Sequence, residues 1–107
     1  MQKIIALFNL RPGVSPGDYE AWARERDLKT VRSLKSVAAF NVFRSAAVLG
    51  SDEVPPYQYF EILDISDMGL LGEEVQSAAM QKIVQEFGEL ADNPKLLIVN
   101  DIEKSEA

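Results

Sequence analysis

Four short segments of the chain are rich in aliphatic, β-branched and aromatic residues. They are residues 3–10, 36–44, 57–65 and 95–102. This composition favours strands, and turn-forming Gly, Pro, Asn and Asp lie between the segments. The first segment is too short to be the apolar core of a signal peptide, so it is interpreted as a strand too. We therefore predict four strands.

A helix is predicted between the first two strands, over residues 16–34, where apolar side chains recur at helical spacing. Its start is well marked. Ser15 is suited to cap the N-terminus, and Pro16 suits the first turn. Asp18 stands three residues after the cap, where a carboxylate interacts favourably with the helix dipole.

A second helix is predicted after the third strand. It begins at the Ser66–Asp67 cap and ends before Pro94, because proline cannot continue a helix. Its apolar stripe has the clearest period in the chain. The stripe consists of Leu71, Val75, Ala79, Ile83, Phe87 and Leu90.

The predicted order of elements is strand, helix, strand, strand, helix, strand. This is the pattern of an α+β, ferredoxin-like βαββαβ fold, in which two helices cover one face of a four-stranded antiparallel sheet. With 107 residues the chain has room for one domain, residues 1–107. The third strand is partly apolar on both faces, and exposed apolar faces favour association. We therefore predict a homodimer whose sheets face each other, a dimeric α-β barrel.

The formal net charge of −6 arises in the last part of the chain, because residues 1–66 contain 8 basic and 8 acidic residues. Such an acidic protein is not expected to bind nucleic acid, and no apolar run is long enough to cross a membrane. We expect a cytoplasmic protein that handles small molecules or partner proteins. Phosphate loops and paired metal-ligand spacings are absent from the sequence, so no cofactor and no metal are predicted.

The chain contains neither Cys nor His. This excludes thiol nucleophiles, Ser-His-Asp triads and histidine-based proton transfer. Acid–base chemistry therefore falls to Asp, Glu, Tyr, Lys or water.

Asp27 is the most informative candidate. Steps of four along the first helix give Tyr19, Ala23, Asp27 and Val31, a stripe that is expected to face the sheet. A carboxylate within that stripe is either paired or has a raised pKa, and in a pocket it would serve as a general base. The alternative is that Asp27 lies at the edge of the stripe in a salt bridge with Arg24 or Lys35.

Other polar and aromatic residues interrupt the apolar pattern near Asp27 or along the strands. Together they predict a polar, aromatic-lined pocket between helix and sheet, in which Asn and Tyr orient a ligand without ionising. The candidate ligand-binding residues are Tyr19, Trp22, Arg26, Asn41, Phe43, Tyr57, Tyr59 and Glu61.

The segment 19–44 resembles the REDY-like family of dimeric α-β barrel proteins. The resemblance is carried by Tyr19-Glu20-Ala21-Trp22-Ala23-Arg24-Glu25-Arg26-Asp27, Thr30-Val31-Arg32, Leu34, Ser36-Val37, Phe40, Val42 and Arg44. It implies a place beside enzymes that make red tripyrrole (prodigiosin-type) pigments or indole-derived alkaloids. Some relatives are implied to act as cofactor-free cyclases or to guide a reactive intermediate. A wider group of relatives has a His and a Pro on the first helix, and the nearest positions here are Asp27 and Lys29.

Two main hypotheses follow. In the first, the protein is a cofactor-free enzyme that binds a flat, apolar pyrrole-type intermediate of the bipyrrole branch. Asp27 would transfer a proton during a cyclisation, dehydration or tautomerisation. In the second, the protein is a non-catalytic carrier of a labile intermediate, or a scaffold for a pathway enzyme. A cofactor-free monooxygenase is a third interpretation.

Overall fold

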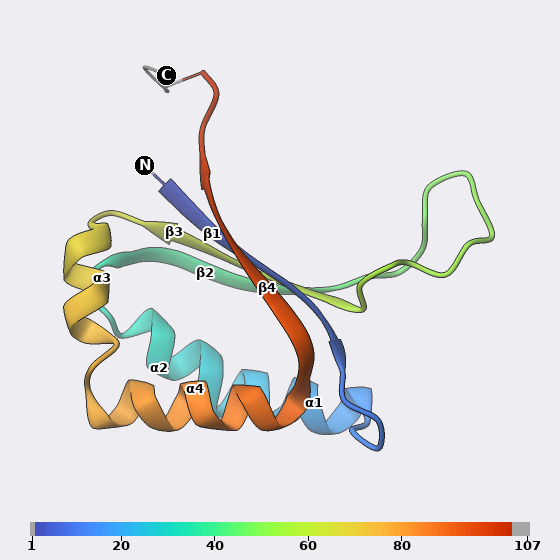
Figure 1. Ribbon diagram of the computed structural model, residues 1–107, viewed down its shortest axis with the longest axis horizontal. Coiled ribbons are helices and arrows are strands. Elements are labelled where there is room, and N and C mark those ends of the chain that lie inside the picture. Colours follow the sequence, from blue (N-terminus) through green and yellow to red (C-terminus); the bar gives the residue numbers. More distant parts are fainter. Residues whose placement is uncertain (1, 104–107) are drawn as a thin grey trace.

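The structure, a computed structural model, describes residues 2–103. This part of the chain forms four strands, four α-helices and one π-helical turn (Figure 1). The order is β1 (Gln2–Leu10), α1 (Pro16–Trp22), the π-helical turn η1 (Ala23–Asp27), α2 (Leu28–Arg32), β2 (Val37–Arg44), β3 (Tyr59–Ile65), α3 (Met68–Glu74), α4 (Ala78–Leu90) and β4 (Ala91–Asn100).

The four strands form one antiparallel sheet in the order β2-β3-β1-β4. All the helices lie on one side of it, with α1, η1 and α2 beside α4 (Figure 1). The ferredoxin-like arrangement predicted from the sequence is therefore confirmed. No helix within residues 2–103 is both long and apolar enough to cross a membrane.

The first helix is continuous but changes its winding at η1. The N–H of Leu28 donates to the carbonyl of Ala23, which is the wider hydrogen-bond spacing of a π-turn. In an α-helix of 3.6 residues per turn, a four-residue step overshoots one turn by about 40°, so a stripe at strict steps of four drifts around the helix. The wider turn offsets this drift, and Tyr19, Ala23, Asp27 and Val31 are all buried.

The N-terminal caps agree with the sequence prediction. The Ser15 hydroxyl accepts a hydrogen bond from the backbone N–H of Asp18 at 3.1 Å. At the other helical segment, the Asp67 carboxylate accepts from the N–H of Leu70 at 3.0 Å.

The prediction of one long second helix was wrong. The chain leaves α3 at Val75, and Ser77 then caps a separate helix, α4, by accepting from the N–H of Met80. The break turns Ala79, which the apolar stripe had included, toward solvent. A local Ser cap thus outweighs the periodic pattern.

Several strand and helix ends also differ from the prediction. The first helix ends at Arg32, and β3 begins at Tyr59. β4 begins at Ala91, so that Pro94 lies inside a strand. This is tolerated because β4 is an edge strand, and its pairing with β1 shifts register between Leu7 and Asn9.

The two faces of the sheet have different surroundings. The inner face packs against the helices through residues such as Ala6, Phe8, Phe40 and Tyr59, all of them buried. The alternate residues point to the outer face, which no element within residues 2–103 covers (Figure 1). Its apolar members are Ile5, Leu7, Phe43, Phe60, Ile62, Leu97 and Val99.

Candidate active site

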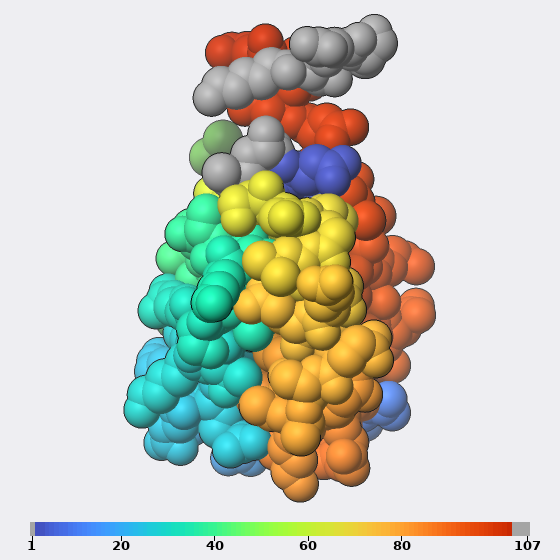
Figure 2. All heavy atoms as spheres, turned by 90° about the vertical axis from the view of Figure 1, so that its left-hand side faces the viewer, coloured from blue at the N-terminus to red at the C-terminus, as the bar shows by residue number. Residues whose placement is uncertain are grey.

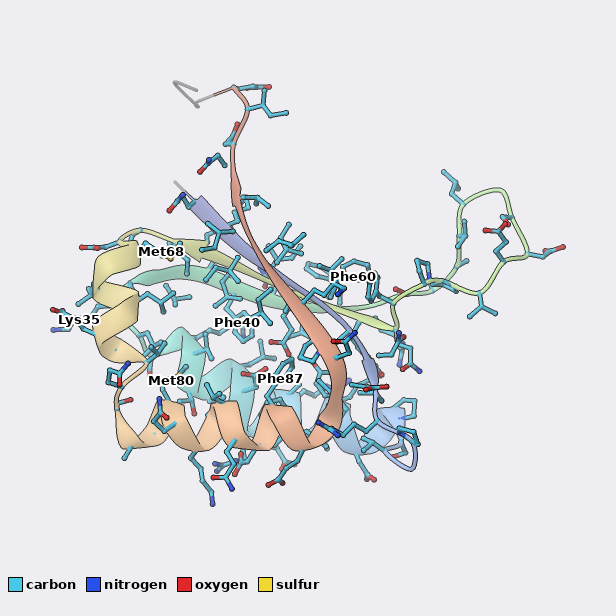
Figure 3. All side chains as sticks on the ribbon, in the orientation of Figure 1. Lys35, Phe40, Phe60, Met68, Met80 and Phe87 are labelled. Carbon is cyan, nitrogen blue, oxygen red and sulfur yellow. The ribbon has the colours of Figure 1, made fainter. Side chains whose placement is uncertain are left out.

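A cavity of about 400 Å³ lies between the inner face of the sheet and the helices. Phe40 from β2 and Met80 and Phe87 from α4 lie in this space (Figure 3). Most of the lining is hydrocarbon, and two carboxyl groups, Asp27 and Glu61, interrupt it. Such a cavity is the usual form of a small-molecule site.

The carboxyl groups come from opposite layers. Asp27 is the last residue of the π-turn η1 and lies on the side of the helix that faces the sheet. Glu61 lies on the inner face of β3. Their exposed fractions are 3% and 6%. The sequence singled out both residues, and the structure brings them together at one wall of the cavity.

Burial decides the protonation of this pair. Desolvation raises the pKa of Asp27 to about 6. Desolvation also raises the pKa of Glu61 well above its ordinary value, and the negative charge of Asp27 raises it further. The contact between the two groups acts on them in opposite directions: it lowers the pKa of Asp27 and raises that of Glu61 further. Glu61 is therefore the carboxyl group that holds its proton more strongly.

No salt bridge joins Asp27 to a cation within residues 2–103. Arg24, one of the partners considered from the sequence, pairs with Glu20 instead at 3.3 Å. Asp27 Oδ2 is buried and accepts no hydrogen bond from the part of the chain that the structure describes. A buried acceptor without a donor is unusual, because leaving such a group unpaired is costly.

Tyr19 forms a buried hydrogen bond with Glu61. Its hydroxyl donates to Glu61 Oε2 at 2.5 Å, and its side chain is fully buried. Burial and the charge of Glu61 raise the pKa of Tyr19, so the phenol stays a neutral donor. Tyr19 thus fixes one oxygen of Glu61 but does not itself line the cavity.

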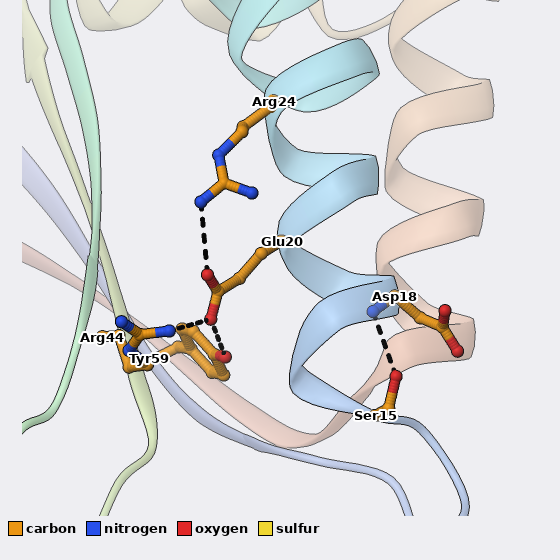
Figure 4. A network of polar contacts seen from close by, with 6 residues as sticks. All are labelled: Ser15, Asp18, Glu20, Arg24, Arg44 and Tyr59. Carbon is orange, nitrogen blue, oxygen red and sulfur yellow. Dashed lines mark hydrogen bonds and ion pairs between the residues drawn. The ribbon is translucent and has the colours of Figure 1, made fainter.

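Tyr59 belongs to a neighbouring polar network (Figure 4). Its hydroxyl donates to Glu20 at 2.6 Å, and Arg44 donates to the same carboxylate at 2.8 Å. The pKa of Tyr59 is raised to about 12, mainly by burial. Its ring lies 4.5 Å from that of Tyr19, so the network packs against the residue that holds Glu61.

Trp22 and Arg26 both point to Glu86 on α4. The indole N–H of Trp22 donates to Glu86 Oε1 at 2.9 Å, and Arg26 donates to the same oxygen at 2.6 Å. This contact ties the first helix to α4 beside the cavity. Neither Trp22 nor Arg26 lines it, although both were expected to contact ligand.

Three other predicted ligand residues lie away from the cavity. Asn41 and Phe43 alternate with the inward-facing Val42, so they point to the outer face of the sheet, where Phe43 pairs with Phe60. Tyr57 precedes β3, and its ring packs edge-on against Phe60. The predicted pocket that joined these residues to Asp27 was therefore wrong, because strand parity separates them.

Some residues of the site gave no clear sequence signal. Ala6, Val84, Gly88 and Leu96 line the cavity because the packing of β1, α4 and β4 brings them together. Glu86 lies outside the apolar stripe of α4, and the sequence analysis did not single it out. No cluster of three or more metal-ligating side chains occurs within residues 2–103.

The sequence profile described as REDY-like protein HapK matches residues 2–102, which is nearly the whole chain. This chain belongs to the REDY-like HapK family. The match agrees with the resemblance carried by residues 19–44. No curated protein sequence matches the chain significantly.

Solved structures extend the comparison. HapK from Hahella chejuensis shares 26% identity with this REDY-like chain, with a TM-score of 0.77 over 100% of this chain and 98% of that one. A dimeric ferredoxin-like protein of unknown function from Thermobifida fusca has a TM-score of 0.73 at 12% identity, over 94% and 90%. A mutant of SnoaB, a cofactor-independent oxygenase from Streptomyces nogalater, has a TM-score of 0.74 at 9% identity, over 99% and 97%. The last two similarities show the shared fold alone.

Proposed function

We propose that this protein is a cofactor-independent enzyme of prodigiosin-type pigment biosynthesis, acting on an apolar intermediate of the bipyrrole branch. One observation carries the proposal of catalysis: two carboxyl groups, Asp27 and Glu61, are buried at the wall of an otherwise apolar cavity. The pigment pathway rests on the family resemblance. In the proposal Asp27 acts first as a base and then, once protonated, as the acid that proton transfer also needs.

The proposed chemistry uses Asp27 as the base. Its carboxylate takes a proton from one atom of the substrate, and the resulting acid returns the proton to another atom. A tautomerisation or cyclisation then leaves the mass unchanged. If the returned proton leaves with a hydroxyl group, the product has lost one water. Glu61 stays protonated and stabilises the carboxylate form of Asp27 through the shared hydrogen bond.

Purified protein should be incubated with the bipyrrole intermediates that accumulate in a strain lacking this gene, and conversion followed by mass spectrometry. We expect either a new isomer of unchanged mass or loss of water. Asp27→Asn should abolish conversion while retaining ligand, and Asp52→Asn, in an exposed loop, is the matched control. Retention of an intermediate without conversion by the natural chain would favour the carrier hypothesis.

We also propose that the protein is a homodimer with its outer sheet faces together. The outer face carries apolar side chains on all four strands, and Phe43 and Leu97 are each 50% exposed. Exposed apolar patches of this kind mark association surfaces. The dimeric description of the ferredoxin-like protein from Thermobifida fusca is consistent with this arrangement.

A further inference from the structure

We infer that the cavity takes an apolar ligand about two rings long, which enters between α4 and β4 with a hydrogen-bond donor at its leading end. The inference rests on the proposed function, because it concerns the same cavity. It specifies how the ligand enters, how long it is and which of its ends is polar.

The entrance lies between α4 and β4. The cavity-lining residues that are exposed are Val84 and Gly88 on α4 and Leu96 on β4. A side chain at Gly88 would meet nothing within 4 Å, so this part of α4 borders open space. At the end of the molecule that faces the viewer in Figure 2, atoms of α3 and α4 lie beside those of α2. Leu71 of α3 is buried.

Strand register gives the length of the path. On the inner face, Leu96 of β4 stands opposite Ala6 of β1, which stands opposite Glu61 of β3. Neighbouring strands are about 4.8 Å apart, so the entrance and the acid pair are separated by about 10 Å. This matches the long axis of a molecule with two rings. The small side chain of Ala6 forms the floor of this path.

The acid pair decides which end enters first. Tyr19 already occupies Glu61 Oε2, whereas Asp27 Oδ2 has no donor in the described part of the chain. An N–H or O–H group at the inner end of a ligand would satisfy this acceptor. A carboxylate in the same place would meet another buried negative charge without a cation. The cavity should therefore select donors and reject anions.

Three naphthalene probes of similar size test this inference at pH 7.5. They are 2-naphthylamine, 2-methylnaphthalene and 2-naphthoate, and binding is measured by titration calorimetry or ligand fluorescence. One hydrogen bond to a charged group corresponds to about tenfold or more in affinity. We expect the amine to bind about tenfold more tightly than the methyl compound, with no measurable binding of naphthoate. Equal affinities, or binding of naphthoate, would overturn the inferred polarity.

Variants separate the route from the polarity. Ala6→Leu should lower the affinity for both neutral probes at least about tenfold, because the larger side chain would block the path. Ala79→Leu, on the exposed side of α4, should leave both affinities unchanged. Asp27→Leu should remove the preference for the amine but retain the methyl compound. If Ala6→Leu does not fold, Val84→Trp and Leu96→Trp test the entrance instead. Unchanged binding in the folded variants would overturn the route.

The two proposals fail in different ways. If the natural chain binds none of the probes, the inferred ligand class is wrong, whatever the pathway assay shows. If the probes follow the expected order but no bipyrrole intermediate is converted, the proposed catalysis is wrong and the binding inference stands.

Discussion

Asp27 and Glu61 face each other across the two layers of the protein, one from a π-turn and the other from the central strand β3. Asp27 raises the cost of ionising Glu61, and burial among hydrocarbon raises the cost of ionising both carboxyl groups. Stability is thereby given up at a site whose arrangement suits proton transfer. This relationship leads to predictions that do not require the substrate.

The first prediction concerns the pH dependence of stability. Asp27 titrates near its ordinary value of 3.8 in the unfolded chain and at about 6 in the folded protein. Its contribution is therefore fully present below about pH 4 and is lost as the pH rises through 6. Asp27→Asn should be the more stable protein at pH 7.5, by about 3 kcal/mol, and should lose this advantage at pH 4.

Urea unfolding of both proteins between pH 4 and 7.5 tests this prediction. The difference in unfolding free energy is the informative quantity, because the pKa values of Glu20, Glu74 and Glu86 are lowered and those groups act in the opposite direction. Asp52→Asn provides the control. A difference that does not vary with pH would mean that Asp27 is ionised normally.

Tyr19→Phe should raise the pKa of Glu61 and lower the stability, while the aromatic ring continues to fill the core. The variant loses the hydroxyl that donates to Glu61 at 2.5 Å, and an unpaired buried acceptor costs about 1–3 kcal/mol. Because this hydrogen bond lowers the pKa of Glu61, its loss should raise that pKa further. Urea unfolding measures the cost, and the carboxyl resonance of Glu61 in pH-dependent NMR measures the shift. Tyr57→Phe should change neither quantity.

Ile62→Lys should weaken self-association. Ile62 lies on the outer sheet face opposite Ile5 and Asn41, and a lysine there would place a charge within the proposed interface. Sedimentation velocity should show a dimer for the natural chain and a monomer for the variant at micromolar concentration. Ala79→Lys, on α4, should remain dimeric. A monomeric natural chain would refute the proposed interface.

Glu86→Ala should release the first helix from α4. Glu86 accepts from both Trp22 and Arg26, and these bonds lower its pKa. Trp22 is the single tryptophan, so tryptophan fluorescence comes from this residue alone. We expect acrylamide to quench the variant more efficiently than the natural chain. Glu89→Ala is the matched control, and equal quenching in all three proteins would show that Glu86 does not shield the indole.

The sequence by itself determined the order of strands and helices, and it identified Asp27 as an unusual residue. Strand composition, the Ser15 cap and the stripe from Tyr19 to Val31 are local properties, and each follows from the residues that carry it. The order of these elements then specified the ferredoxin-like sheet. The stripe also indicated that a carboxylate would be buried.

Only the tertiary structure decided what Asp27 faces. Its pairing with Glu61 depends on the register of β3 and on the π-turn, and neither is encoded in a local pattern. Strand parity likewise sent Asn41 and Phe43 to the outer face, since a shift of one residue reverses the direction of a side chain. The cavity too depends on how two layers pack, because residues of the helices and of the sheet line it together.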